Sequence, residues 1–334
     1  MMSGQTTSVS AERRRAMLRT AMGPAIAAAL SDSRVIEIMV NPDGALRIDI
    51  LGEGRVDTDV KLDPAQVERI IRLVASHVRS EVHGDKPIVS AELPPLGSGA
   101  GERFEGILPP VSTAPCFSIR KPAARIYTLM DYVTDGIMSA EAARLLSVAV
   151  VDRRNILVAG GTSSGKTTLA NALLAEMADL DERVILIEDT RELQSPARDT
   201  VALRTRPSSS DKNTAVTMGD LVRSTLRLRP DRIIVGEVRG GEALDMLKAW
   251  NTGHPGGIAT VHANSAASAL YRIEQLIQEA VVIVPRHLVA EAINIIVFIA
   301  GRGTARRIAQ WIDNPQFGST PWAAMGAGFN NSVH

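Results

Sequence analysis

The segment that most constrains the fold is the run GGTSSGKT at residues 160–167, which satisfies every fixed position of G-x-x-x-x-G-K-[ST]. An apolar run, NILVAG (155–160), precedes it, and a helix-like segment follows. In such a loop the backbone N–H groups converge on one anion, and the dipole of the following helix adds positive potential. The alternative, a glycine-rich turn without a ligand, is disfavoured because motif and context agree. The sequence therefore predicts a P-loop that binds a nucleoside triphosphate.

The side chains of this loop have separate predicted roles. Lys166 is expected to bridge the β- and γ-phosphates of ATP, and the hydroxyl of Thr167 is expected to coordinate Mg²⁺. The predicted nucleotide-binding residues in this part of the chain are Gly160, Gly161, Thr162, Ser163, Ser164, Gly165, Lys166, Thr167 and Thr168.

Two acidic strand ends are candidates for the chemistry at the phosphates. Glu237 ends the apolar run RIIVGE (232–237), a place that suits the base that orients and deprotonates an attacking water. Glu188, which ends a second apolar run just before Asp189, is the alternative acid and a candidate Mg²⁺ ligand through water. Either acid could instead be a solvated strand end, and this alternative carries more weight for Glu188.

A histidine follows the apolar run GIATV (257–261). His262 is expected to lie beside the γ-phosphate, where it would sense the phosphate or couple it to a neighbouring subunit. A lone histidine is more often structural, and His254 is interpreted in that way, as a loop residue. His262 therefore joins the candidate catalytic residues.

The N-terminal third has the pattern of a small α+β domain. A helix is expected over residues 13–30, interrupted near Pro24, and another over 63–82. Between them Leu46, Ile48 and Ile50 alternate with polar residues, as in a strand with one buried face. Turn sequences separate these strands, so we expect an antiparallel sheet.

From about residue 137 the pattern changes. Continuous apolar strands at 155–160, 183–189, 232–237, 257–263 and 293–300 are separated by helical segments. Strands without polar alternation are buried on both faces, which is typical of a mainly parallel sheet covered by helices. The predicted fold class is therefore α/β in this part, after the smaller α+β domain.

Composition excludes several classes of function. The chain carries 37 basic and 37 acidic residues and only 3% aromatic residues, which disfavours stable direct binding of nucleic acid. A single cysteine, Cys116, excludes a four-cysteine zinc site and an intramolecular disulfide. No apolar run reaches 18 residues, so we expect a cytoplasmic protein, or one attached to a membrane through its partners.

Four segments in series carry a family resemblance. GGTSSGKTTL, IEDTREL, LRPDRIIVGEVRGGEA and GHPGGIATVHANS resemble the Walker A, Asp box, Walker B and His box of the secretion ATPase superfamily. The likeness covers about residues 30–300. EIMVNPDG and GERFEG in the N-terminal part look most like the TrbB-type traffic ATPases of conjugation and type IV secretion. Type II secretion and pilus-extension ATPases usually carry a tetracysteine module, which this chain lacks, whereas pilus-retraction and tight-adherence pilus ATPases remain near alternatives.

This resemblance implies a ring-forming ATPase, a homo-hexamer at the cytoplasmic face of the inner membrane, that powers pilus assembly or substrate transfer. Its implied partners are the inner-membrane secretion-channel components and a coupling ATPase, with peripheral membrane contact. The domains implied are an N-terminal domain over 1–122, a linker over 123–136, a RecA-like P-loop domain over 137–310 and a disordered tail over 311–334.

The resemblance also adds arginines. It implies that Arg103 and Arg120 reach the phosphates from the N-terminal domain and that Arg239 bridges to the phosphate or holds a loop. The alternative is that Arg103 and Arg120 pair with surface carboxylates. One departure is Ser163, where the family usually has glycine, so a positive φ at this position would carry a modest strain.

Two other classes of function stay open at this point. A nucleic-acid translocase or helicase would share the core, and a nucleotide-regulated scaffold would bind ATP with little turnover. DNA-stimulated hydrolysis would favour the first, and steady phosphate release that depends on Glu237 would exclude the second.

Overall fold

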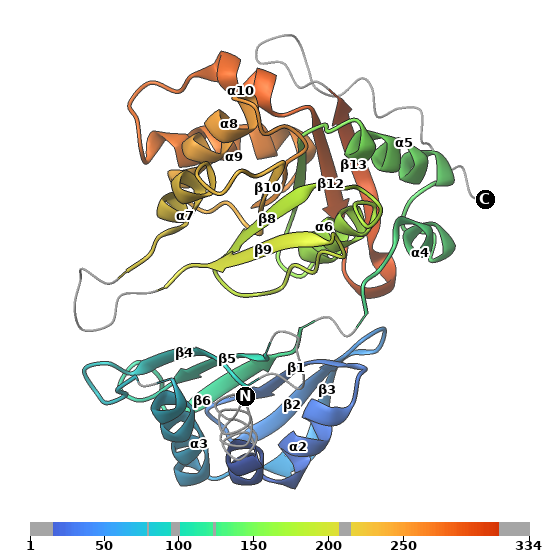
Figure 1. Cartoon of the computed structure of the whole chain (residues 1–334). Coiled ribbons are helices and arrows are strands. Elements are labelled where there is room, and N and C mark those ends of the chain that lie inside the picture. The colour runs from blue at the N-terminus through green and yellow to red at the C-terminus, as the bar shows by residue number, and fades with distance from the viewer. Residues whose placement is uncertain (1–15, 79, 95–100, 123–124, 207–214, 314–334) are drawn as a thin grey trace, which may run out of the picture. The chain divides into compact units, whose positions relative to one another are not determined.

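The computed structural model describes residues 16–78, 80–94, 101–122, 125–206 and 215–313 (Figure 1). The chain divides into two compact units, Met1–Ala124 and Arg125–His334. The division falls inside the predicted linker 123–136, but most of that linker is wrong. Leu129–Thr134 forms helix α4, whose Leu129 and Tyr132 are buried in the second unit. The missed signal is a capping box, since the Thr128 hydroxyl accepts a hydrogen bond from Asp131 N–H and the Asp131 carboxylate accepts one from Thr128 N–H.

The N-terminal unit is built on a six-stranded antiparallel sheet in the order β3-β2-β1-β6-β5-β4. A buried cluster that includes Ile38, Ile71, Phe104 and Ile119 joins the sheet to its helices. The predicted interruption of the first helix is confirmed, because Gly23 has φ 84° just before Pro24. The elements are α2 (Pro24–Ser31), β1 (Val35–Val40), β2 (Ala45–Ile50), β3 (Gly54–Lys61), α3 (Pro64–His77), β4 (Ile88–Glu92), β5 (Arg103–Ile107) and β6 (Cys116–Arg120).

The C-terminal unit contains a seven-stranded sheet in the order β13-β12-β7-β11-β10-β8-β9. Its strands are parallel except β13, which pairs antiparallel with β12 at the edge. The predicted α/β fold class is therefore confirmed. The strands are β7 (Ile156–Gly160), β8 (Arg183–Glu188), β9 (Asp199–Arg204), β10 (Arg232–Val235), β11 (Ile258–His262), β12 (Ile295–Ala300) and β13 (Arg307–Asp313).

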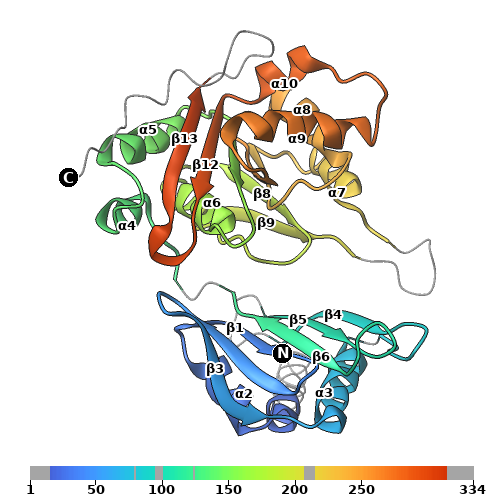
Figure 2. The ribbon, with the colours of Figure 1, turned by 180° about the vertical axis from the view of Figure 1, so that it is seen from behind.

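Helices cover both faces of this sheet, as Figures 1 and 2 show from opposite sides. Leu157 and Ala159 of β7 belong to one buried cluster, and Ile156 and Val158 belong to the other. This alternation explains why the strand is apolar at every position. The helices are α4 (Leu129–Thr134), α5 (Ala140–Val151), α6 (Lys166–Ala175), α7 (Met218–Thr225), α8 (Glu242–Asn251), α9 (Ala266–Gln278), α10 (Arg286–Ala292) and the short 3₁₀ turn η2 (Gly303–Ala305).

The C-terminal end of this unit differs from the prediction. β13 continues through Asp313, so residues 311–313 belong to the sheet and not to the predicted tail; residues 314–334 lie outside the described part of the chain. Among the described helices, none has the length and apolar character that a membrane crossing requires.

Candidate nucleotide site

The candidate site lies where the parallel strands of the second unit end. In the sheet register Gly160, the last residue of β7, pairs with His262 of β11 on one side and with Ile299 of β12 on the other. Glu237 follows β10, the next strand beyond β11. Parallel pairing therefore brings the P-loop, Glu237 and His262 to one edge of the sheet, as their positions after strands predict.

The P-loop has a backbone that suits an anion. Gly165 has φ 100° and is the N-cap of α6, and as a glycine it has no side chain to cap the helix. Ser163 has φ 61°, so the residue that departs from the family pattern does occupy the left-handed region. The Ser164 hydroxyl donates to Gly161 O at 2.9 Å and closes the loop on itself.

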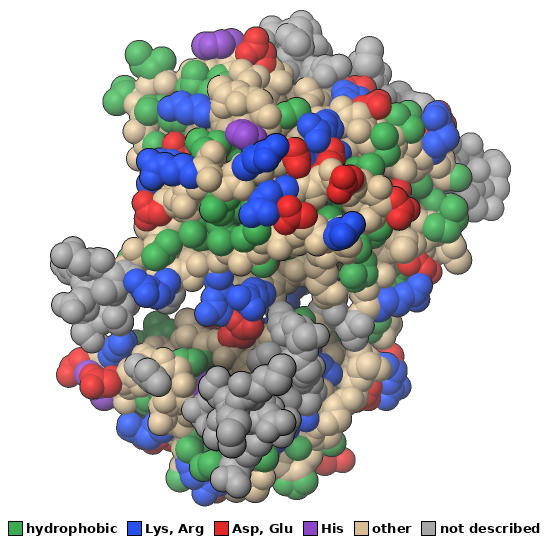
Figure 3. Space-filling model, in the orientation of Figure 1, with side chains coloured by type: hydrophobic (Ala, Val, Ile, Leu, Met, Phe, Trp, Pro, Cys, Tyr) green, Lys and Arg blue, Asp and Glu red, His purple; other side chains and the backbone are tan. Residues whose placement is uncertain are grey.

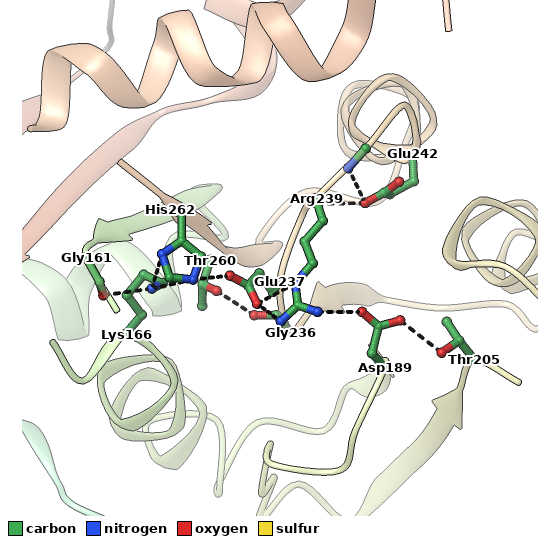
Figure 4. A network of polar contacts seen from close by, with 11 residues as sticks. Gly161, Lys166, Asp189, Thr205, Gly236, Glu237, Arg239, Glu242, Thr260 and His262 are labelled. Carbon is green, nitrogen blue, oxygen red and sulfur yellow. Dashed lines mark hydrogen bonds and ion pairs between the residues drawn. The ribbon is translucent and has the colours of Figure 1, made fainter. Parts of the chain in front are cut away.

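A polar network connects the P-loop lysine to Glu237 (Figure 4). Lys166 Nζ lies 3.1 Å from Gly161 O and 3.3 Å from His262 Nδ1. His262 Nε2 lies 3.4 Å from the same lysine nitrogen and 2.7 Å from Glu237 Oε1. Burial and the positive charge of Lys166 lower the pKa of His262, and Glu237 opposes them. The imidazole is therefore neutral at pH 7 and links a cation to a carboxylate.

Arg239 extends this network on the other oxygen of Glu237. Its Nε donates to Glu237 Oε2 at 2.7 Å, and its Nη1 lies 3.4 Å from Asp189 Oδ2. Asp189 also accepts a hydrogen bond from the Thr205 hydroxyl at 2.9 Å. The predicted residues Lys166, Glu237, Arg239 and His262 thus lie together. Asp189 follows Glu188, so the signal that predicted Glu188, an acidic residue at the end of an apolar run, also indicates Asp189. Nothing in the sequence marks Thr205.

Glu188 has a different environment from Glu237. It lies buried at the end of β8, and its Oε1 accepts hydrogen bonds from the backbone N–H groups of Glu192 and Leu193 at 2.9 and 2.8 Å. Burial raises its pKa to about 7, although these two donors favour the charged form. The contacts found in the described structure therefore connect Glu188 to the following loop, and its role at a metal stays a prediction.

Arg103 and Arg120 belong to the N-terminal unit. They lie directly opposite each other on β5 and β6. Glu37 is opposite Arg120 on the next strand, and Glu92 is opposite Arg103. Both arginines are therefore adjacent to a second arginine and to a carboxylate, an arrangement that allows both roles considered for them.

The surface of the second unit carries both signs of charge. On the face shown in Figure 3, acidic and basic side chains are interspersed over this unit. This mixture agrees with the equal numbers of acidic and basic residues in the chain. The face shown therefore lacks the single-sign field that steers nucleic acid to a protein.

Comparison with known proteins decides the family. The model of the family described as "Type II/IV secretion system protein" matches residues 68–302, which include the whole network described above. The chain belongs to this family. It is 47% identical to the conjugal transfer protein TrbB of Rhizobium radiobacter over 297 residues, which cover 88% of each chain. It is 34% identical to the type IV secretion system protein PtlH of Bordetella pertussis over 311 residues, covering 84% of this chain and 90% of PtlH.

A solved structure supports the fold. The pilus retraction motor PilT with bound ADP matches with a TM-score of 0.57 at 19% identity, over 80% of this chain and 74% of PilT. The TrbB and PtlH relatives show that this secretion ATPase is of the conjugal transfer and type IV secretion type. Membership of the family implies ATP hydrolysis. The resemblance stated from the four motifs is confirmed.

Proposed function

We propose that this secretion ATPase forms a ring and hydrolyses ATP to power conjugative type IV secretion, by pilus assembly or by substrate transfer across the inner membrane. One observation carries the proposal: Glu237 ends the Walker B segment in direct contact with His262, which in turn contacts the P-loop lysine. This arrangement places a carboxylate beside the residue expected to hold the γ-phosphate. The 47% identical TrbB relative supports the conjugative branch.

ATP and Mg²⁺ fit the residues of the site. Gly165, a left-handed N-cap without a side chain, lets a phosphate chain approach the N-terminus of α6, and Lys166 supplies charge. Thr167 would add one oxygen ligand for Mg²⁺. Within the described ranges no group of three or more His, Cys, Asp or Glu side chains could hold a metal. Most ligands would therefore come from phosphate and water, as is usual for Mg²⁺ at such sites.

Hydrolysis would begin with an exchange of partners. Phosphate would draw Lys166 away from His262, and this would change the charge felt by the imidazole. Glu237 would orient the attacking water and accept its proton, while Arg239 holds the second carboxylate oxygen in place. His262, which contacts both Lys166 and Glu237, would report the presence of the γ-phosphate.

The N-terminal arginines would supply charge from the other unit. Two arginines opposite each other on adjacent strands repel, and an anion that both contact would offset that repulsion. We therefore propose that Arg103 and Arg120 reach the phosphates of ATP. Loss of the γ-phosphate would then remove the anion that both arginines contact.

The assembly proposed is a homo-hexamer at the cytoplasmic face of the inner membrane. Its partners would be the secretion-channel components and a coupling ATPase, with peripheral membrane contact and no stable binding of nucleic acid. Head-to-tail contacts between copies would close the ring. Mass measurement with and without ATP, alongside hydrolysis, tests this assembly, and an active monomer would contradict it.

The catalytic assignment has a direct test. Glu237→Gln keeps the size of the side chain but removes the base, so phosphate release should fall by about 10²- to 10⁴-fold while ADP binding is kept. Glu242→Gln is the matched control, because Glu242 Oε1 accepts hydrogen bonds from the backbone N–H groups of Arg239 and Gly240, and the amide oxygen of a glutamine can still accept both. Unchanged hydrolysis in Glu237→Gln would refute the assignment. Strong, salt-dependent stimulation by single-stranded DNA would instead favour a translocase.

A further inference from the structure

The outer face of α5 carries a row of apolar side chains, which we call the α5 stripe. Leu145, Val148 and Val151 recur at every third position of the helix and are 37%, 44% and 56% exposed. Residues 145–151 include no charged side chain. A helix face that contacts only water normally carries polar residues, so the stripe indicates a surface that another segment or molecule covers.

Helix α4 extends this apolar surface. Met130 of α4 is 68% exposed, and α4 packs against α5. Figures 1 and 2 show the two helices side by side, next to β13 at the edge of the sheet. Ile308 and Trp311 of β13 pack against the same core cluster that buries the inner side of α5. The α5 stripe therefore lies near the strand with which the described part of the chain ends.

The chain leaves β13 beside one end of the α5 stripe. Asp313, the last residue of β13, pairs with Arg154, and its Oδ2 lies 3.3 Å from the Nη1 of that arginine. Arg154 follows closely after Val151, the last residue of α5. Residues 314–334 therefore begin near the Val151 end of the stripe. From there to Leu145 the helix rises about 9 Å, a length that about three extended residues span.

The sequence of residues 314–334 suits an apolar surface. This segment contains no Lys, Arg, Asp or Glu, although charged residues make up 22% of the chain. It does contain four large apolar side chains, Phe317, Trp322, Met325 and Phe329. Their distance from β13 along the sequence is long enough for each to reach the α5 stripe. An uncharged segment with aromatic side chains thus begins beside an uncharged apolar stripe.

The short connection to β13 makes a weak contact sufficient. A segment tethered close to its binding surface has an effective concentration on the order of millimolar. Burial of one tryptophan removes about 200 Å² from water, which corresponds to a dissociation constant between about 0.1 and 1 mM. A second copy of the chain would meet the same stripe only at its bulk concentration. Dilute protein therefore favours the segment of the same chain as the occupant.

We propose that residues 314–334 dock on the α5 stripe of their own chain, with Trp322 as the main buried side chain. The docked segment covers the apolar surface and keeps it from contacts with other proteins. This surface is formed by α4 and α5, so the inference does not depend on the proposed function. The alternative is the disordered tail expected from the sequence, in which Trp322 would be fully accessible to solvent.

Fluorescence of Trp322 in the full chain tests the docking. The difference in emission between the native chain and Trp322→Phe isolates this side chain from Trp250 and Trp311. Acrylamide quenching of the difference signal then measures how accessible the indole is. In the native chain Trp322 should be quenched about two- to five-fold less than in denaturant, as a contact of this strength predicts at a millimolar effective concentration.

Paired substitutions locate the docking surface. Val148→Gln combined with Val151→Gln makes the stripe polar at positions that already face solvent, so the fold should be kept, and melting temperatures verify this. The matched control is Val282→Gln combined with Ile283→Gln, since these residues lie between α9 and α10 and are 96% and 84% exposed. The α5 pair should remove most of the protection of Trp322, and the control pair should leave it unchanged.

Three results would overturn the inference. Equal quenching of Trp322 in the native and denatured chain would show that the segment does not dock. Protection that survives the α5 pair would assign the docking to another surface. Protection that increases with protein concentration would make a second copy the partner. None of these results bears on ATP hydrolysis, so the proposed function would stand.

Discussion

His262 should take up a proton when the nucleotide binds. Burial and Lys166 hold its pKa below the ordinary value of 6.5; Glu237 raises this pKa, and Arg239 and Arg272 lower it. Phosphate would neutralise Lys166 and bring further negative charge to the site. The pKa of His262 therefore rises on binding, and the complex holds more protons than the free protein over an interval around the ordinary histidine pKa.

The magnitude follows from the contact distance. Lys166 Nζ lies 3.3 Å from His262 Nδ1, and the side chain of His262 is 46% exposed. With a dielectric close to that of water, removal of one such repulsion is worth about 1 kcal/mol. Protonated His262 would also form a full ion pair with Glu237 at their present separation of 2.7 Å. The affinity for ADP should therefore rise by about five-fold as the pH falls through this interval.

Calorimetric titration with ADP in buffers of different ionisation enthalpy measures the proton uptake directly. The native chain should take up part of one proton per site near pH 6.5. His262→Asn should abolish this uptake. His254→Asn is the control, because His254 Nδ1 contacts Pro230 O in a loop and lies outside the network. Proton release on binding, or uptake that survives His262→Asn, would refute the reasoning.

Three further predictions concern stability, measured by unfolding with denaturant. The folded-state pKa of Glu188 is raised to about 7, so the free energy of unfolding should fall by roughly 3 kcal/mol as the pH rises from 4.5 through 7, and Glu188→Gln should flatten this slope. Glu182→Gln should cost about 3–5 kcal/mol, because it leaves the guanidinium of Arg232, which is 1% exposed, without its carboxylate. Gly257→Ala should cost at least about 1–3 kcal/mol, because the added methyl would lie 2.0 Å from Trp250 Nε1. Unchanged unfolding in any of these variants would contradict the corresponding argument.

The extent of the sequence prediction is clearest at the P-loop and at α4. The loop was predicted because its spacing alone requires a strand before it and a helix after it. The segment around α4 was interpreted as linker, since a six-residue helix is too short for a periodic apolar pattern to appear. Its capping residues, Thr128 and Asp131, were the only local signal.

Local sequence determined which residues take part in the chemistry. The apolar runs predicted a parallel sheet that is buried on both faces. Glu237 and His262 follow two of these runs, and they lie at one edge of the sheet because parallel strands end together. The lysine followed from the loop motif. These conclusions need only the chain order and the physics of burial.

Tertiary structure decided what the chain order leaves free. The order β13-β12-β7-β11-β10-β8-β9 pairs strands that are distant in sequence, and it places the β12–β13 turn on the side of the P-loop opposite Glu237. Arg306 thereby covers Gly165, a contact across more than a hundred residues that no spacing could indicate. Likewise, burial and hydrogen bonding gave Glu188 and Glu237 different partners, although both are glutamates at the ends of apolar strands, because a side chain's environment depends on which elements pack around it.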